Sequence, residues 1–143
     1  MSHTGLPPFD STIQTTNIWL NDVVERLGWG DHRRAYHALR AVLHALRDRL
    51  PVDQAAALAA QLPMLVRGFY YEGWHPHGKP VRERHKADFL AHIAAAYPNS
   101  FDVEIEEVTR AVFHVLSKHV TGGEVEAVKR SLPAEIRALW ACA

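Results

Sequence analysis

The chain repeats part of itself at one constant offset, and this repetition limits its possible folds more than any other feature. RAVLHAL at residues 40–46 returns as RAVFHVL at 110–116, and QLPMLVRGFY at 61–70 aligns with SLPAEIRALW at 131–140. No gap separates the two blocks in this alignment, and we call the offset from Arg40 to Arg110 one repeat length. Unrelated amphipathic helices do not readily keep Arg-x-x-x-His and Leu-Pro-x-x-x-Arg at one common offset, so we interpret the pattern as an internal duplication.

Both copies have the apolar spacing of helices. Over residues 31–50, one apolar stripe advances by alternate steps of three and four, through Tyr36, Leu39, Leu43, Leu46 and Leu50. We expect Asp10 or Ser11 to cap the helix before it and Asp53 to cap the helix after it. The second copy repeats this plan, with helices expected near residues 83–96, 103–120 and 124–131 and a last one from Pro133. No segment alternates with the period of two that is typical of a strand.

The sequence therefore predicts an all-α protein with two tandem helical repeats, each of about three or four helices. We expect the repeats to pack as one compact bundle around a pseudo-twofold axis. The expected divisions are a flexible leader at residues 1–10, the first repeat at 11–72, a joint at 73–82 and the second repeat at 83–143.

Composition excludes several classes of function. Lys plus Arg equals Asp plus Glu at 16 each, so no net charge steers nucleic acid or anionic lipid toward the chain. Cys142 is the only cysteine, which excludes an internal disulfide and a thiolate metal site. No apolar run approaches the roughly 18 residues of a membrane span, and the N-terminus lacks the features of a signal peptide. These features predict a cytoplasmic protein with no membrane partner.

The stretch YYEGWHPHGKP at residues 70–80, which overlaps the expected joint at 73–82, contains three candidate binding residues: Tyr71, Trp74 and His75. Its glycines and prolines forbid a continuous helix, and we expect Trp74 to anchor the segment by packing. The basic stretch KPVRERHK that follows could form a stacking groove with these aromatics. The zero net charge and the nearby acidic residues favour an ordinary helix start, so we do not expect nucleic-acid binding.

The duplication also keeps an Arg-x-x-x-His pair in each copy, Arg40 with His44 and Arg110 with His114. Each pair lies beside the apolar stripe of its helix. One interpretation is a boundary face where the imidazole hydrogen-bonds a carbonyl or carboxylate of a neighbouring helix. The alternative places both pairs between the two halves, where histidine could respond to pH near about 6 to 7.

Ten histidines suggest metal binding, but their spacing does not support it. Proline separates His75 from His77, His114 and His119 are a poor pair on a helix, and HExxH is absent. Gly-rich phosphate loops and the GxSxG nucleophile motif are absent too. We therefore expect no metal, no other cofactor and no catalytic residue.

Several long motifs carry a family resemblance: WLNDVVERLGW, ALRAVLHALRDRLPVDQAAALAAQLPMLVRGFYYEGW with the GKP that follows, and SLPAEIRALW. Over residues 9–140 the chain closely resembles a family of small bacterial proteins catalogued as domain of unknown function 2267. The resemblance implies an all-helical, cytoplasmic bacterial protein and carries over no catalytic residue. Many relatives have an acidic residue at the position of His75, which argues against a general metal role there.

These observations together predict a non-catalytic helical module that binds a protein partner, a second copy of itself or a small ligand. We expect the binding residues among Arg40, His44, Arg110, His114, Tyr71, Trp74 and His75. The alternative function is a small-molecule enzyme that uses histidine and arginine side chains in the cleft between the repeats.

Overall fold

The computed structural model describes residues 4–97 and 103–140, and within these ranges the chain forms eight α-helices, one 3-10 helix and no strand. In chain order these are α1 (Pro7–Leu27), α2 (His32–Arg49), α3 (Val52–Ala59), α4 (Met64–Tyr71), α5 (Lys86–Ala95), α6 (Ile105–His119), α7 (Gly122–Arg130), α8 (Ala134–Arg137) and η1 (Ala138–Trp140). The predicted all-α fold class is confirmed. Cys142 lies outside the described residues.

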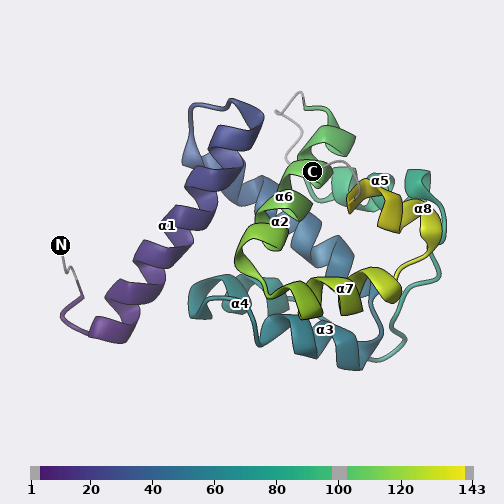
Figure 1. The fold of residues 1–143 in the computed structure, drawn as a ribbon, viewed down its shortest axis with the longest axis horizontal. Coiled ribbons are helices and arrows are strands. Elements are labelled where there is room, and N and C mark those ends of the chain that lie inside the picture. The colour runs from purple at the N-terminus through teal and green to yellow at the C-terminus, as the bar shows by residue number, and fades with distance from the viewer. Residues whose placement is uncertain (1–3, 98–102, 141–143) are drawn as a thin grey trace.

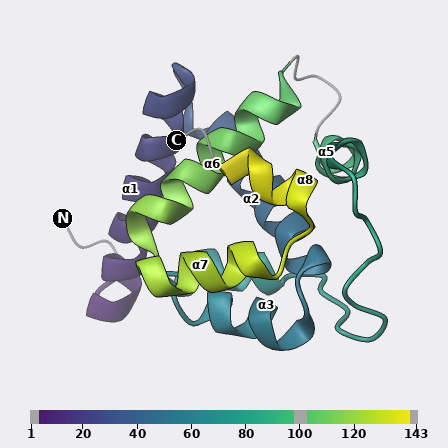
Figure 2. The ribbon, with the colours of Figure 1, turned by 45° about the vertical axis from the view of Figure 1, so that its right-hand side comes forward.

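Helices α2 and α6 pack against each other at the centre of the bundle (Figure 1). α1 packs on both of them from one side, and α5 packs on both from the other side. α3 and α7 lie side by side below the central pair (Figure 2), while α4 packs on α2 and η1 packs on α6.

The core is one continuous cluster of buried side chains from all of these elements. α2 buries alanines on several sides, including Ala38, Ala41 and Ala45, so neighbouring helices can approach it closely all round. In α6, the Phe113 ring stacks on Trp140 with a centroid distance of 4.0 Å. The two central helices therefore hold the surrounding ones in place through packing rather than through isolated contacts.

α1 begins earlier than the sequence predicted, at Pro7 instead of after a cap at Asp10 or Ser11. Proline fits the first helical turn because its missing N–H has no helical partner there in any case. The Asp10 carboxylate accepts hydrogen bonds from the backbone N–H and hydroxyl of Thr4, at 3.1 and 2.8 Å. The 21-residue helix ends at Gly28, which has a φ of 70°. Its N-terminal end extends past the rest of the bundle (Figure 1).

Two other helix starts have clear causes. Asp31 caps α2 by accepting from the N–H of Arg34 at 3.1 Å, and Thr121 caps α7 through the N–H of Glu124 at 3.3 Å. The prediction that Asp53 caps α3 is wrong, because Pro51 occupies the cap position. The Asp53 carboxylate lies in the first turn instead, where it complements the helix dipole.

Residues 72–85 connect α4 to α5 without a helix. Gly73 and Gly78 have φ values of 77° and 81°, in the left-handed region that favours glycine. The connection returns to α2, where the N–H of Val81 donates to the carbonyl of Asp48 at 2.9 Å. None of the described helices is both long enough and apolar enough to span a lipid bilayer.

Candidate functional site

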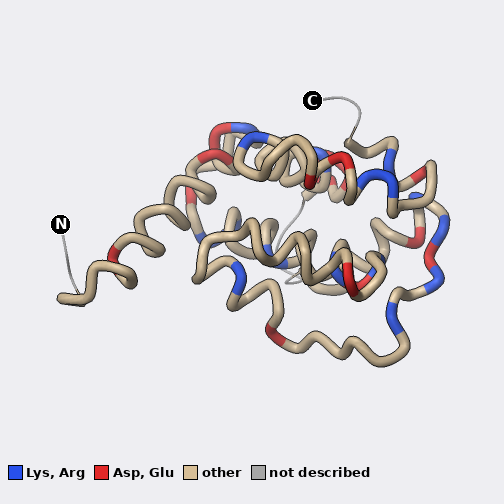
Figure 3. The backbone as a smooth tube through the Cα atoms, turned by 60° about the horizontal axis from the view of Figure 1, so that its bottom comes forward, with Lys and Arg blue, Asp and Glu red and all other residues tan. Residues whose placement is uncertain are grey.

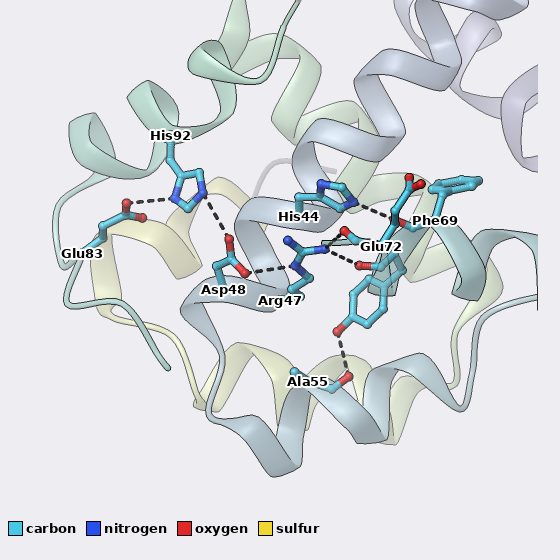
Figure 4. A network of polar contacts seen from close by, with 9 residues as sticks. His44, Arg47, Asp48, Ala55, Phe69, Glu72, Glu83 and His92 are labelled. Carbon is cyan, nitrogen blue, oxygen red and sulfur yellow. Dashed lines mark hydrogen bonds and ion pairs between the residues drawn. The ribbon is translucent and has the colours of Figure 1, made fainter. Parts of the chain in front are cut away.

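A chain of polar contacts surrounds the C-terminal half of α2, and Arg47 lies at its centre (Figure 4). Arg47 is only 6% exposed. Its Nε donates to Asp48 at 3.0 Å, and its Nη1 donates to the carbonyls of Tyr70 and Glu72, both at 2.8 Å. A buried guanidinium needs such partners to offset the loss of water, and here one carboxylate and two carbonyls supply them.

These contacts complete the C-terminus of α4, whose own last turn contains no basic residue. The last carbonyls of a helix have no partner within it. His44 donates from Nε2 to the carbonyl of Phe69 at 2.6 Å, beside the two bonds from Arg47. Burial lowers the pKa of His44 from its ordinary 6.5, and the Phe69 carbonyl offsets only part of that effect. His44 is therefore a largely neutral donor that fixes α4 to α2.

Arg40 lies one helical turn before His44 and also reaches the end of α4. Its Nη2 donates to the Glu72 carboxylate at 3.1 Å. Both side chains are partly or largely exposed, so this ion pair contributes less than about 1 kcal/mol. Arg40 and His44 thus act on the same neighbouring helix end.

His92, on α5, lies between two carboxylates (Figure 4). Its Nδ1 donates to Glu83 at 2.9 Å, and its Nε2 lies 3.4 Å from Asp48. Hydrogen bonding to Asp48 raises the pKa of His92 above 6.5, and Glu83 adds to this against the opposing effect of burial. The two carboxylates together therefore favour the charged form of the His92 ring.

Three of the predicted residues lie at the start of the joint, and two of them contact each other. Tyr71 and Trp74 stack with a centroid distance of 5.4 Å and an interplanar angle of 25°. Both rings are half-buried, and both pack against the core. His75 follows them directly in the chain and is exposed.

The second predicted pair, Arg110 and His114, is divided between two places. Arg110 donates to Glu106 at 2.9 Å and to the carbonyls of Ala138 and Leu139, each at 3.3 Å. His114 instead lines a surface hollow of about 250 Å³ together with Arg26 and other charged side chains of α1 and α6. Burial and the nearby Arg26 and Lys118 charges lower the pKa of His114. The two predicted pairs therefore have different contacts, because Arg40 and His44 reach the end of α4 and Arg110 reaches η1.

Sequence reasoning missed an ion pair between α1 and the end of α6. Asp22 accepts from Lys118 at 3.0 Å and from His119 Nε2 at 2.6 Å. The His119 ring stacks on Trp19 at a centroid distance of 4.8 Å. Burial acts to raise the pKa of Asp22, but the hydrogen bonds from His119 and Lys118 outweigh it, so the pKa lies below 3.8.

Sequence reasoning also missed an apolar surface between α1 and α4. Five of the large apolar side chains that are exposed within the described residues belong to it, and we call them the α1–α4 face: Leu6, Phe9, Ile13, Met64 and Leu65. The N–H of Leu65 donates to the Thr12 hydroxyl at 2.9 Å and joins the two helices. A hollow of about 320 Å³ lies between them, lined by Phe9, Ile13, Met64, Leu65 and Gly68 among others. The signal in the sequence was the spacing of residues 6, 9 and 13, which belong to one helical stripe.

The polar groups around α2 are occupied by one another. Both ring nitrogens of His92 face carboxylates, and Arg47 is held by Asp48 and two carbonyls. Within residues 4–97 and 103–140, no three His, Cys, Asp or Glu side chains are placed to hold a metal ion together. This arrangement is suited to joining helices and the connection between them.

A family model described as "Uncharacterized conserved protein (DUF2267)" matches residues 16–139. The chain belongs to the DUF2267 family. The match spans the α2 network and the Asp22 ion pair of this DUF2267 protein, and it leaves residues 7–15 of α1 outside. No curated protein matches the chain.

Proposed function

We propose that this DUF2267 protein is a non-catalytic protein-interaction module, built from two helical repeats around a pseudo-twofold axis, that binds its partner through the α1–α4 face. The observation that carries the proposal is the gathering of five exposed large apolar side chains on one face. Single exposed apolar residues are ordinary on a protein surface, whereas a contiguous group marks a contact site.

The helix bounds support the two repeats. The ends of α2 and α6, at Arg49 and His119, are one repeat length apart, and so are the starts of α3 and α7, at Val52 and Gly122. Aligned arginines also make aligned bonds. Arg67 donates to the carbonyls of Ala59 and Leu62, and Arg137 donates to the carbonyls one repeat length later, of Lys129 and Leu132.

The packing supports the axis. α1 contacts α6 while α5 contacts α2, so the contacts between the repeats are reciprocal, as a twofold arrangement requires. Each central or lower helix also meets its own counterpart, α2 with α6 and α3 with α7. Gln54 donates to Glu124, its counterpart one repeat length away in the chain, and a residue can meet its counterpart only near such an axis.

The first predicted pair, Arg40 and His44, fits this function as a support for the binding face. His44 and Arg40 bind the end of α4, and the Tyr71–Trp74 stack lies where α4 passes into the joint. α4 in turn carries Met64 and Leu65. These side chains therefore hold in place the helix that forms half of the α1–α4 face.

Site-specific photo-crosslinking in living cells of the source organism tests the proposal. A photoreactive amino acid replaces Ile13, or replaces Ile18 as the matched control. The two isoleucines lie on the same helix and are 42% and 47% exposed, but only Ile13 belongs to the face. We expect protein adducts from position 13 and few from position 18. Equal yields, or no adduct from position 13, would overturn the proposal.

A second hollow favours small-ligand binding as a second candidate function. It measures about 420 Å³. The polar side chains that line it are Ser11, Thr12, Thr15, Gln61 and His119, and they lie beside apolar ones that include Trp19 and Met64. Hydroxyl, amide and imidazole groups around one hollow suit a small polar molecule. Ligand-observed NMR with a set of polar metabolites tests this function, and Thr15→Val should weaken any genuine binding.

A further inference from the structure

We infer that the α1–α4 face is a contact between two copies of this chain, which pair about a twofold axis through the N-terminal part of α1. This inference rests on the proposed function and names the partner for it. The reasons lie in the extension of α1, in the course of its apolar stripe, in the charge of the face and in the shape of its hollow.

The N-terminal part of α1 has no helical counterpart in the second repeat. α5 begins at Lys86, which aligns with Thr16, so residues 7–15 of α1 extend beyond the repeated unit. The family match also begins at Thr16. The corresponding residues 77–85 belong to the connection between α4 and α5, and Glu135 accepts a hydrogen bond from the N–H of Lys86 at 2.9 Å. Leu65 aligns with Glu135, so the first repeat has an apolar residue where the second has a charged one.

The apolar stripe of α1 is buried at one end and open at the other. Leu20 and Val23 face the core. The same stripe continues toward the N-terminus at steps of three and four, first through the buried Thr16 and then through Ile13, Phe9 and Leu6, which are exposed. Within residues 4–97 and 103–140, no element covers this part of the stripe.

Charge favours a second copy as that element. Asp10 is the only charged residue from Pro7 to Asn21, and the guanidinium of Arg67, the only charge within α4, donates to two carbonyls of its own repeat. Figure 3 shows the same scarcity of charge along the extension. A twofold contact places each surface against its own copy, where like charges would repel, so a nearly uncharged face is suited to it. A membrane surface or a nucleic acid would require Lys or Arg beside the face, and none occurs from Thr4 to Glu25.

The shape of the face lets each copy give and receive side chains. Gly68 forms part of the floor of the hollow between α1 and α4, and a Cβ added there would meet nothing within 4 Å. A neighbouring hollow of about 370 Å³ continues along α4 past Gly68 to Tyr71 and Glu72, whose carboxylate is paired with Arg40. The exposed α1 stripe of one copy can therefore enter the α4 hollows of the other, and the reverse contact follows from the symmetry.

Sedimentation equilibrium of the purified full chain tests the inference. We expect the mass to rise with concentration from 16.1 kDa toward twice that value. Ile13→Asp should weaken the association by about tenfold or more, because it places a carboxylate in the buried contact. Ile18→Asp is the matched control and should leave the association unchanged.

Gly68→Gln gives an independent test that does not depend on α1. The glutamine side chain extends from the floor of the hollow into its open space, and glutamine is a better helix former than glycine, so the fold should persist while the association weakens. A wild-type chain that stays monomeric at every concentration would overturn the inference, as would an equal loss of association in Ile18→Asp. If the purified chain is monomeric but position 13 crosslinks to a different protein, the proposed function stands and the twofold pair is rejected. If the purified chain is monomeric and position 13 gives no protein adduct, both the twofold pair and the proposed function are rejected.

Discussion

Asp22 and His92 lie one repeat length apart in the chain and make the same contact with opposite charge. Asp22, on α1, pairs with Lys118 near the end of α6. His92, on α5, pairs with Asp48 near the end of α2, and Asp48 lies one repeat length before Lys118. If either proposed repeat paired with a copy of itself, Asp22 would face Asp48, or His92 would face Lys118. The charges are therefore complementary only between the two different repeats.

Replacing the residues of the Asp22–Lys118 contact by those of the His92–Asp48 contact should give a contact that stabilises the fold to a similar extent. Lys118→Asp places a second carboxylate against Asp22 and should lower the free energy of unfolding by about 1–2 kcal/mol. Adding Asp22→His copies the Asp48–His92 pair onto this side and should restore most of the loss. Urea unfolding of both variants measures the recovery.

Lys118→Ala serves as the control for this exchange, because it removes the attraction without adding repulsion. The free energy of unfolding of Lys118→Ala should lie between that of the wild type and that of Lys118→Asp. A double variant no more stable than Lys118→Asp would show that the two contacts are not equivalent.

His92 should stabilise the fold most at low pH. Its pKa is raised above 6.5 in the folded state, so the folded protein holds the proton more tightly than the unfolded chain. The contribution is fully present below about pH 6.5 and is lost as pH rises through the folded pKa. The difference in the free energy of unfolding between the wild type and His92→Gln should therefore decrease as pH increases. Urea unfolding measured from about pH 5 to about pH 9 checks this expectation.

His44 should behave in the opposite way, which makes it the natural comparison. Burial lowers its folded pKa below 6.5, so the unfolded chain takes up the proton first as pH falls. The gap between the wild type and His44→Gln should widen as pH rises toward neutrality. If the stability differences caused by His44→Gln and His92→Gln changed with pH in the same direction, the environments assigned to the two histidines would be wrong.

Arg47 should be among the least replaceable polar residues of the chain. Arg47→Met removes the donor to the Tyr70 and Glu72 carbonyls and should cost about 2–4 kcal/mol of unfolding free energy. Arg33→Met, at an exposed position of the same helix, should change stability by less than about 0.5 kcal/mol. Similar midpoints in urea for the two variants would show that the α4 terminus does not depend on Arg47.

Trp74 should anchor the joint through its stack on Tyr71. Trp74→Ala should lower the free energy of unfolding by about 2 kcal/mol, because the indole is half-buried rather than fully buried. Trp74→Phe keeps an aromatic ring and should retain most of the stability. An unchanged thermal melt with weakened partner binding would instead make Trp74 part of a contact surface.

Periodicity was enough to predict the all-α class, because the Leu39–Leu43–Leu46 spacing reports directly which side of a helix is buried. It could not predict the Asp22–Lys118 contact, because the two residues are 96 positions apart and meet only through the packing of α1 on α6. For the same reason, the sequence did not predict the contact between His92 and Asp48. The sequence did not predict the α1–α4 face because Pro7 and Pro8 were interpreted as part of a loose leader. These two prolines in fact begin the helix.

The bond from Gln54 to Glu124 shows what covalent linkage of the two units permits. Separate, identical units would bring two amides or two carboxylates together at that spot, and two carboxylates there would repel each other. Within a single polypeptide the two sides can differ, so one side donates the hydrogen bond and the other accepts it. In the proposed two-repeat arrangement, the contact between Gln54 and Glu124 is therefore a place where the two halves differ in sequence and still fit each other.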